Sequence, residues 1–377
     1  YTPSGDYVVV KFARWAFEKF EGVADVLGTQ MRAVGEVMSI GKTYKEAFQK
    51  AVRSLETNRY GLGFARNFHQ LPLEKLLGAL GSPSSERHFQ MYEALRKGAD
   101  VQALHRITHI KPWFIEQMKE LVALEEEILI YQGGRLPDGL LEQAKKDGFA
   151  DRYLARLIGC REIEIREQRR ALNVVEAWEP VPVSGVDEAA YYYSTYNAPD
   201  RVEVSERRKI MVLGGGPNRI GQGIEFDYCC VHAAFALSQD GFETIMINCN
   251  PETVSTDYDT SDRLYFEPLT LEHVLNVCRR EKPDGVILQL GGQTPLKLAH
   301  GLEEAGIPVW GTSPEAIDLA EDRGRFGELL SEEGVAQPAN GAARSVEEGV
   351  RMACEIGFPI LVRPSYVLGG RAMAICY

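Results

Sequence analysis

The feature that most constrains the fold is a regular alternation of short apolar runs with amphipathic stretches after residue 202. The apolar runs have the length of buried strands and lie at 210–213, 244–247, 286–290 and 307–310. Helical periodicity is found between them, at 229–237, 271–278 and 296–302. This order is typical of βαβ units and a parallel sheet, in which ligands bind beyond the carboxyl ends of the strands. The loops that begin at Gly214, Asn248 and Gly291 should therefore share one edge of the sheet.

The C-terminal part continues with helix and strand patterns. A long helix is predicted over 314–333, a second over 346–356, and a strand over 360–363. Arg363 ends that strand directly before a proline, which aims its guanidinium at whatever the strand edge holds. Gly369 and Gly370 then provide a flexible turn suited to covering phosphates.

Residues 57–201 are predicted to be helical. Pro112 fits the first position of a helix, and Gly148 and Gly159 fit positions just past helix ends. The stretch 181–199 has neither the helical nor the strand period and is predicted to be an extended linker. This part contains no nucleophile–base pair or metal cluster, which favours a packing or assembly role.

Residues 1–56 are too few to bury a core of their own. A strand is predicted at 7–11, and Thr43 and Glu46 have the spacing of a capping box in front of a helix over 44–55. These elements must dock on the rest of the chain or on further sequence. Since the chain lacks an initiator Met, we expect its first residue to be a cut end.

Composition excludes several classes of protein. Acidic residues outnumber basic ones by 54 to 42, and the net charge of −12 argues against a general nucleic-acid binder. Seven cysteines without metal-ligand spacing indicate reduced thiols in an intracellular protein. No apolar run reaches the ~18 residues that a membrane span needs.

The first glycine loop, Gly214 to Gly216 followed by Pro, Asn and Arg219, raises the question of dinucleotide binding. Arg219 stands where the third glycine of the G-x-G-x-x-G motif should be, and no acidic residue closes the second strand to bind a ribose. The loop therefore disfavours NAD or FAD. Its backbone N–H groups and Arg219 favour an anion instead.

Three other charged residues near these loops have two possible interpretations. Glu225 and Glu252 could together bind a cationic or hydrogen-bonding small molecule, or they could simply cap helices. Arg323, on the predicted long helix, could serve a site or form a solvated ion pair with its neighbours.

The chain resembles the large subunit of carbamoyl-phosphate synthase. Long ordered strings carry the resemblance, at 217–229, 248–259, 291–295 and 363–370. The stretch 29–38 is similar to the close of the family's first ATP-grasp unit, although Arg32 and Ala33 replace the usual Lys and Ser. The similarity to the family's oligomerisation domain is looser, at 113–114 and 148–151. Together these stretches extend the resemblance over essentially all 377 residues.

The resemblance implies an α/β plus all-α architecture. Residues 1–56 would be the tail of the first ATP-grasp (carboxyphosphate) unit, and 57–201 the helical oligomerisation domain and linker. Residues 202–377 would begin the carbamoyl-phosphate half, with a pre-ATP-grasp domain over 202–312 and the start of an ATP-grasp domain over 313–377.

It also implies a reaction in which two homologous halves each use ATP. The first makes carboxyphosphate from bicarbonate, ammonia from a glutaminase small subunit converts it to carbamate, and the second phosphorylates carbamate. Arg363, with Gly369 and Gly370, would hold ATP, and Arg323 would lie beside it. Arg219 would lie near carbamate or the phosphate product. Glu36, Glu225 and Glu252 would line the internal carbamate passage.

The expected cofactors are ATP with Mg²⁺ or Mn²⁺, and K⁺. The family's metal ligands fall outside this chain, so we expect no metal site within it and no activity from the isolated chain. We expect a homo-oligomer formed through 57–201, without nucleic-acid or membrane partners. The plain 214–229 string and the lack of a transit peptide favour a bacterial, cytoplasmic protein of arginine or pyrimidine biosynthesis.

Two alternatives remain at this point. One is another ATP-grasp carboxylase or ligase, similar to biotin carboxylase, against which the helical insert and the 218–229 string argue. The other is a non-catalytic module that mediates self-association through its helices.

Overall fold

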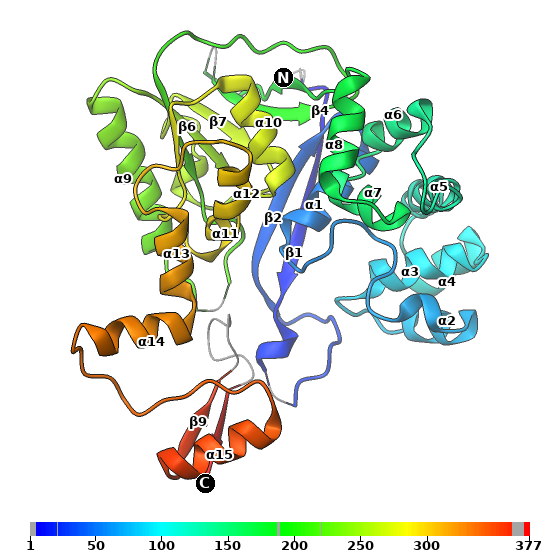
Figure 1. Ribbon diagram of the computed structural model, residues 1–377. Coiled ribbons are helices and arrows are strands. Elements are labelled where there is room, and N and C mark those ends of the chain that lie inside the picture. Colours follow the sequence, from blue (N-terminus) through cyan, green and yellow to red (C-terminus); the bar gives the residue numbers. More distant parts are fainter. Residues whose placement is uncertain (1–4, 21, 187–188, 220, 364–372) are drawn as a thin grey trace.

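A six-stranded sheet lies in the upper part of Figure 1 in the computed structural model, which describes residues 5–20, 22–186, 189–219, 221–363 and 373–377. The strand order is β3-β4-β7-β6-β5-β8, and all neighbours are parallel except β3 and β4. The strands are β3 (Ala177–Pro180), β4 (Tyr191–Thr195), β5 (Lys209–Leu213), β6 (Glu243–Asn248), β7 (Arg263–Phe266) and β8 (Gly285–Ile287). The predicted parallel α/β sheet is confirmed.

Helices cover both faces of this sheet, which explains why its strands read as unbroken apolar runs. Val212 faces α9 (Glu225–Gln239), where it shares a buried cluster with Cys230. Its neighbour Met211 points to the other face, toward α10 (Leu271–Glu281) and α12 (Ala299–Glu304). The alternation of side chains along β5 therefore serves two separate cores.

The prediction of an extended linker over 181–199 is wrong for residues 191–195, which form a strand. This strand is β4, which pairs with β3 and β7 and buries Tyr193 and Thr195. Because both faces of β4 are covered, its sequence shows no alternation, and periodicity could not reveal it. β7 escaped prediction for the same reason, since all four of its residues are buried.

Two further expectations need correction. The apolar run at 307–310 forms only an isolated parallel bridge, between Val309 and Val286. The predicted long helix is divided at Asp322 into α13 (Pro314–Glu321) and α14 (Arg323–Glu332). The Asp322 side chain accepts a hydrogen bond from the backbone N–H of Arg325 at 3.0 Å, so it acts as the N-cap that starts the second helix.

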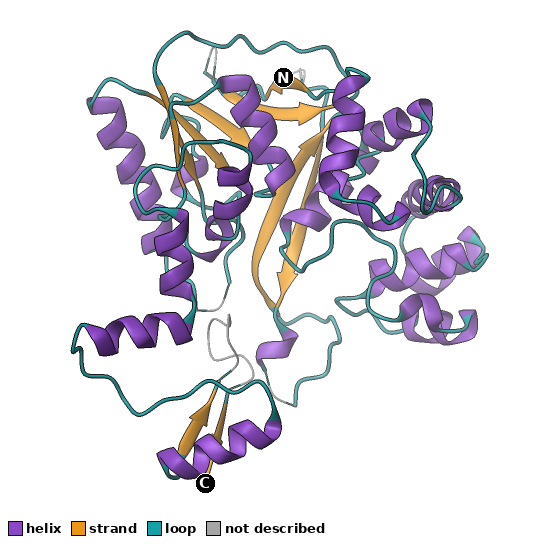
Figure 2. Ribbon diagram, in the orientation of Figure 1, coloured by secondary structure: helices purple, strands orange, loops and turns teal. Residues whose placement is uncertain are grey.

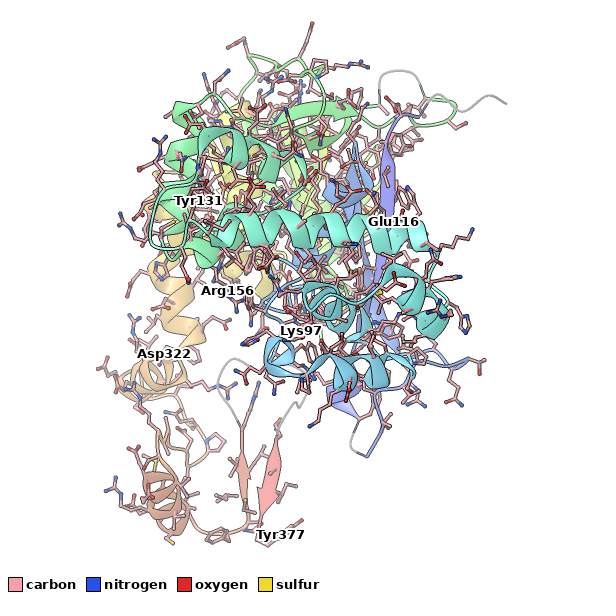
Figure 3. All side chains as sticks on the ribbon, turned by 90° about the vertical axis from the view of Figure 1, so that its right-hand side faces the viewer. Lys97, Glu116, Tyr131, Arg156, Asp322 and Tyr377 are labelled. Atoms are coloured by element: carbon pink, nitrogen blue, oxygen red, sulfur yellow. The ribbon has the colours of Figure 1, made fainter. Side chains whose placement is uncertain are left out.

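The helical part is confirmed, and it stands beside the sheet (Figure 2). Pro112 begins the long helix α5, which crosses this side of the molecule between the labelled Glu116 and Tyr131 in Figure 3. Gly148 and Gly159 follow two of the helices with φ of +90° and +78°. The helices are α2 (Leu73–Leu80), α3 (Arg87–Arg96), α4 (Val101–Thr108), α5 (Pro112–Leu129), α6 (Asp138–Lys146), α7 (Asp151–Ile158) and α8 (Glu162–Ala171).

The N-terminal elements dock on the rest of the chain. The antiparallel strands β1 (Val8–Trp15) and β2 (Ala33–Gly41) lead into α1 (Tyr44–Ser54). The Thr43 side chain accepts from the N–H of Glu46 at 3.3 Å, and the Glu46 carboxylate accepts from the N–H of Lys42 at 2.8 Å. One core cluster extends from Phe12 in β1 through the helices to Phe266 in β7. A short strand-and-helix stretch is thus stabilised by a core that other parts supply.

A buried ionic cluster joins the helical part to the sheet region. The Lys145 ammonium lies 2.8 Å from an Asp151 carboxylate oxygen and 2.6 Å from one of Glu272. The Arg169 guanidinium lies 2.8 Å from the other Asp151 oxygen. All four side chains are at most 5 % exposed. We call Lys145, Asp151, Arg169 and Glu272 the junction cluster.

The C-terminal part extends away from the remainder, from the labelled Asp322 to Tyr377 in Figure 3. It holds α14, α15 (Val346–Ile356) and the antiparallel strands β9 (Ile360–Val362) and β10 (Ala374–Cys376). Past Ile317, Ala353 is the only buried apolar residue among those described. No described helix combines the length and apolar character that crossing a membrane requires.

Candidate functional site

Three glycine- and asparagine-rich loops meet at the carboxyl edge of the sheet, as the sequence predicts. The N–H of Gly216, after β5, donates to the side-chain oxygen of Asn248, at the end of β6, over 3.0 Å. A Cβ atom at Gly291 would lie only 2.6 Å from the carbonyl oxygens of Leu213 and Gly214. Glycine is therefore required where the third loop crosses the first.

A cavity of about 270 Å³ opens between the first two of these loops. Amide side chains line much of it, and the side-chain N–H of Asn250 donates to the Asn218 oxygen at 3.1 Å. Val34, from β2, closes one side. The charged lining residues are Arg219, Asp227 and Glu252. Such a lining offers many hydrogen bonds to a small polar ligand and little apolar surface.

Arg219 is fixed by residues from two distant segments. Its guanidinium lies 2.6 Å from a carboxylate oxygen of Glu56, just after α1, and donates to the hydroxyl of Thr294, in α11 (Gln293–Leu296). The Nε of Arg219 and the second carboxylate oxygen of Glu56 are buried without a partner in the described part of the chain. The predicted anion-binding arginine is thus anchored, and it retains an unused donor.

Glu36 and Glu252, which the resemblance implies line one passage, are brought together by a lysine. The Lys11 ammonium lies 2.7 Å from the Glu36 carboxylate and 3.3 Å from that of Glu252. The Glu36 side chain and the Lys11 ammonium lower the pKa of Glu252. The hydrogen bond that the Lys11 ammonium donates to Glu36 raises the pKa of Lys11 above its ordinary value, against the opposing effect of burial. We call Lys11, Glu36 and Glu252 the lysine–glutamate cluster.

Sequence reasoning missed Lys11 and Glu56. Lys11 becomes visible only in the β1–β2 register, which pairs Ala13 with Glu36 and so places Lys11 diagonally across from Glu36 on the same face. Glu56 gave no signal, since 163 residues separate it from Arg219 and only the tertiary fold brings them together.

Glu225 and Glu252 differ in their surroundings. Glu225 is the exposed first residue of α9, where a negative charge suits the helix dipole, so its capping interpretation stays open. Its carboxylate lies against Gly223, which lines the cavity. Glu252 precedes a short 3-10 helix (Val254–Thr256) that has no side-chain cap. Its carboxylate pairs with Lys11 and does not cap that helix.

The two remaining arginines are not among the residues that line the cavity. Arg323 is the exposed first residue of α14, and the ion pair expected of it is made by Arg325, whose guanidinium lies 2.7 Å from the Asp318 carboxylate. Arg363 directly follows β9 and is exposed. Gly369 and Gly370 lie outside the described residues. Within the described ranges, no group of three or more His, Cys, Asp or Glu side chains could hold a metal ion.

Comparison with known proteins gives three family matches. Residues 36–173 match the carbamoyl-phosphate synthetase large chain oligomerisation domain, and 206–319 match the carbamoyl phosphate synthase preATP-grasp domain. Residues 322–377 match the carbamoyl-phosphate synthase L chain ATP binding domain. The matches follow one another along the chain and together cover most of it.

Individual relatives agree with these matches. The carbamoyl phosphate synthase large chain of Archaeoglobus fulgidus is 51% identical over 384 residues, covering 100% of this chain and 36% of the relative. That of Xylella fastidiosa strain 9a5c is 54% identical over 383 residues, covering 100% of this chain and 35% of the relative. The chain thus spans about a third of their length. A crystal structure of N5-carboxyaminoimidazole ribonucleotide synthetase from Thermus thermophilus aligns over 44% of this chain and 40% of its own, at 20% identity and a TM-score of 0.33.

Proposed function

Because this chain belongs to the carbamoyl phosphate synthase large-chain family, we propose that it forms the central part of an ATP-dependent ligase that makes carbamoyl phosphate. The substrates would be bicarbonate, ammonia from a glutaminase small subunit, and one ATP in each of two homologous halves. The loops at the edge of the present sheet would belong to the second half, which phosphorylates carbamate.

The observation that carries this proposal is the anchoring of Arg219 at the ligand edge of the sheet. Glu56 and Thr294 fix one side of the guanidinium, and its buried Nε has no partner in the described part of the chain. Carbamate and phosphate are small oxyanions, and a pre-oriented guanidinium binds such groups without reorganising. We assign to Arg219 the binding of carbamate or of the phosphate product.

The lysine–glutamate cluster would border the route by which carbamate arrives. Glu252 lines the cavity, and Lys11 links it to Glu36. Carbamate decomposes in water, so a route that excludes bulk water protects it between the two halves. Glu225, beside Gly223, would lie on the same route.

Arg363 and Arg323 stay candidates for ATP binding, since both belong to the segment that matches the ATP binding domain. Mg²⁺ or Mn²⁺, and K⁺, would be held by residues outside this chain, as the resemblance implies. Phosphoryl transfer needs positioning and charge neutralisation. We therefore expect the 377-residue chain alone not to form carbamoyl phosphate.

Self-association through residues 57–201 is the second proposal, supported by the oligomerisation-domain match over 36–173. Trp113 and Ile130, at the two ends of α5, are 51% and 77% exposed. Large exposed apolar side chains mark candidate interfaces. Sedimentation velocity of the intact chain tests this directly.

Replacing Glu252 with glutamine should uncouple the two halves of the full-length synthase. The change removes one carboxylate from Lys11 and loosens the cluster at the cavity. We expect carbamoyl phosphate synthesis to fall about tenfold, while bicarbonate-dependent ATP hydrolysis continues. Glu203→Gln, at an exposed loop position, is the matched control. Equal loss of both activities would contradict a role in passage.

A further inference from the structure

A second cavity, of about 320 Å³, lies where the N-terminal, helical and α/β parts meet. It is lined by the end of α1, by α7 and α8, and by the segments around α10 to α12. Glu56 and Thr294 line it, and both contact Arg219, which lines the first cavity. The two cavities are therefore neighbours on opposite sides of that contact. The proposed synthase reaction uses only the first.

We call this second cavity the junction cavity. Each of its acidic side chains is already paired with a basic side chain that does not line the cavity. Glu162 lies 2.6 Å from the Arg166 guanidinium, and Glu272 lies 2.6 Å from the Lys145 ammonium. Glu56 has Arg219. None of these three cations lines the cavity. The carboxylates therefore add little net negative charge to a ligand's surroundings.

Three basic side chains of the cavity have no carboxylate within ion-pair distance among the described residues. Arg53, Arg152 and Lys297 have no carboxylate partner within the described residues, whereas Arg59 is paired with Glu86. Arg53 is only 5% exposed, and its Nε has no hydrogen-bond partner there. Its Nη1 donates to the carbonyl oxygen of Gly148 at 2.7 Å, and the charge of Glu272 acts on it from a longer distance. A buried guanidinium nitrogen without a partner is costly, which favours a bound anion beside it.

The N-terminus of α10 adds donors to the same cavity. Thr270 occupies the N-cap position, but its hydroxyl pairs with a ring nitrogen of His273 at 2.8 Å and caps no backbone N–H. The first turn at 269–272 lines the cavity. Uncapped N–H groups at a helix N-terminus favour a negative charge.

We propose that the junction cavity binds a phosphate-class dianion, as inorganic phosphate or a small organic phosphate. Arg53 would contact it from the buried side, Arg152 and Lys297 from the rim, and the N-terminus of α10 along its axis. Arg152 is already oriented by Tyr60. Its guanidinium carbon lies 4.4 Å from the centroid of the Tyr60 ring, and one guanidinium nitrogen lies 3.0 Å from the Tyr60 hydroxyl oxygen. The site is distinct from the loops assigned to carbamate, and it does not depend on that assignment.

Isothermal titration of the 377-residue chain with inorganic phosphate, in chloride buffer at constant ionic strength, tests the site. Wild-type protein should bind phosphate saturably, and Arg152→Gln and Lys297→Gln should each weaken binding about tenfold. Arg156→Gln is the matched control, because Arg156 lies one turn from Arg152 on α7, is exposed, and does not line the cavity (Figure 3). It should bind as wild type does.

Absence of saturable binding, or equal binding by all four proteins, would overturn the proposal. The two rim residues are exposed, so their replacement should leave the urea midpoint unchanged, which separates lost binding from misfolding. Because the titration involves no synthase activity, its failure would leave the proposed function standing, and a failure of the synthase assays would leave this site standing.

Discussion

Replacing Lys145 with methionine should lower the free energy of unfolding by about 3–5 kcal/mol. Methionine retains the shape of the side chain but leaves Asp151 with one cation and Glu272 without its nearest one. A buried carboxylate that loses its partner keeps its full desolvation cost. Urea denaturation followed by circular dichroism measures the loss, in the transition that reports the contact between the helical part and the sheet.

Lys146→Met is the control for that variant. Lys146 is 40% exposed and pairs with Glu142 one helical turn away, so its loss should cost less than about 0.5 kcal/mol. Similar destabilisation by the two substitutions would show that the junction cluster has no special role.

The free energies of unfolding of wild type and Lys145→Met should also depend differently on pH. Burial opposes ionisation of Glu272, but Lys145, Arg169 and Arg53 outweigh it and lower the pKa of Glu272 from 4.5 to about 2. Its contribution to stability is therefore present above pH 4.5 and is lost as the pH falls toward 2. Without Lys145 the pKa of Glu272 should rise, so acidification should narrow the stability gap between wild type and Lys145→Met. A gap that widens on acidification would contradict this account.

Replacing Arg219 with glutamine should reduce carbamoyl phosphate synthesis by the full-length synthase about 100-fold or more. The substitution removes the positive charge at the ligand edge of the sheet and leaves the largely buried carboxylate of Glu56 without its partner. Bicarbonate-dependent ATP hydrolysis, which we assign to the other half, should persist. Parallel assays of the two activities at saturating bicarbonate and ammonia measure the effect.

Two further variants sharpen this test. Arg219→Lys retains the charge but lacks the Nε donor that is buried without a partner in the described part of the chain, so it should recover only part of the activity. Arg207→Gln, at a 54% exposed residue whose guanidinium lies 3.6 Å from Asp262, should behave as wild type. Loss of activity in Arg207→Gln equal to that in Arg219→Gln would remove the special role of Arg219.

Local sequence patterns predicted the elements that depend on local physics. The buried strands β5 and β6 and the Thr43 cap are encoded within a few residues of where they act. The break at Asp322 was missed although Asp is a strong N-cap residue, because the helical pattern continued on both sides of it.

Long-range features could not be predicted in this way. β4 is recognisable only once β3 and β7 stand beside it. The partners of Arg219 come from segments 163 and 75 residues away. The resemblance to a family supplied Glu36, Glu225 and Glu252 as a set, but the lysine that joins two of them became visible only in the β1–β2 register. The identity to large chains over the whole chain also disfavours the biotin carboxylase-like alternative.

The measurement that tests the central claim most directly is the yield of carbamoyl phosphate and the consumption of ATP by the full-length protein, with bicarbonate and ammonia, for wild type and Arg219→Gln. The account predicts that wild type forms carbamoyl phosphate with one ATP consumed in each half. It predicts that Arg219→Gln forms little product yet still hydrolyses ATP when bicarbonate is present. A protein that forms no carbamoyl phosphate, or an Arg219→Gln variant that forms it at the wild-type rate, would contradict the account.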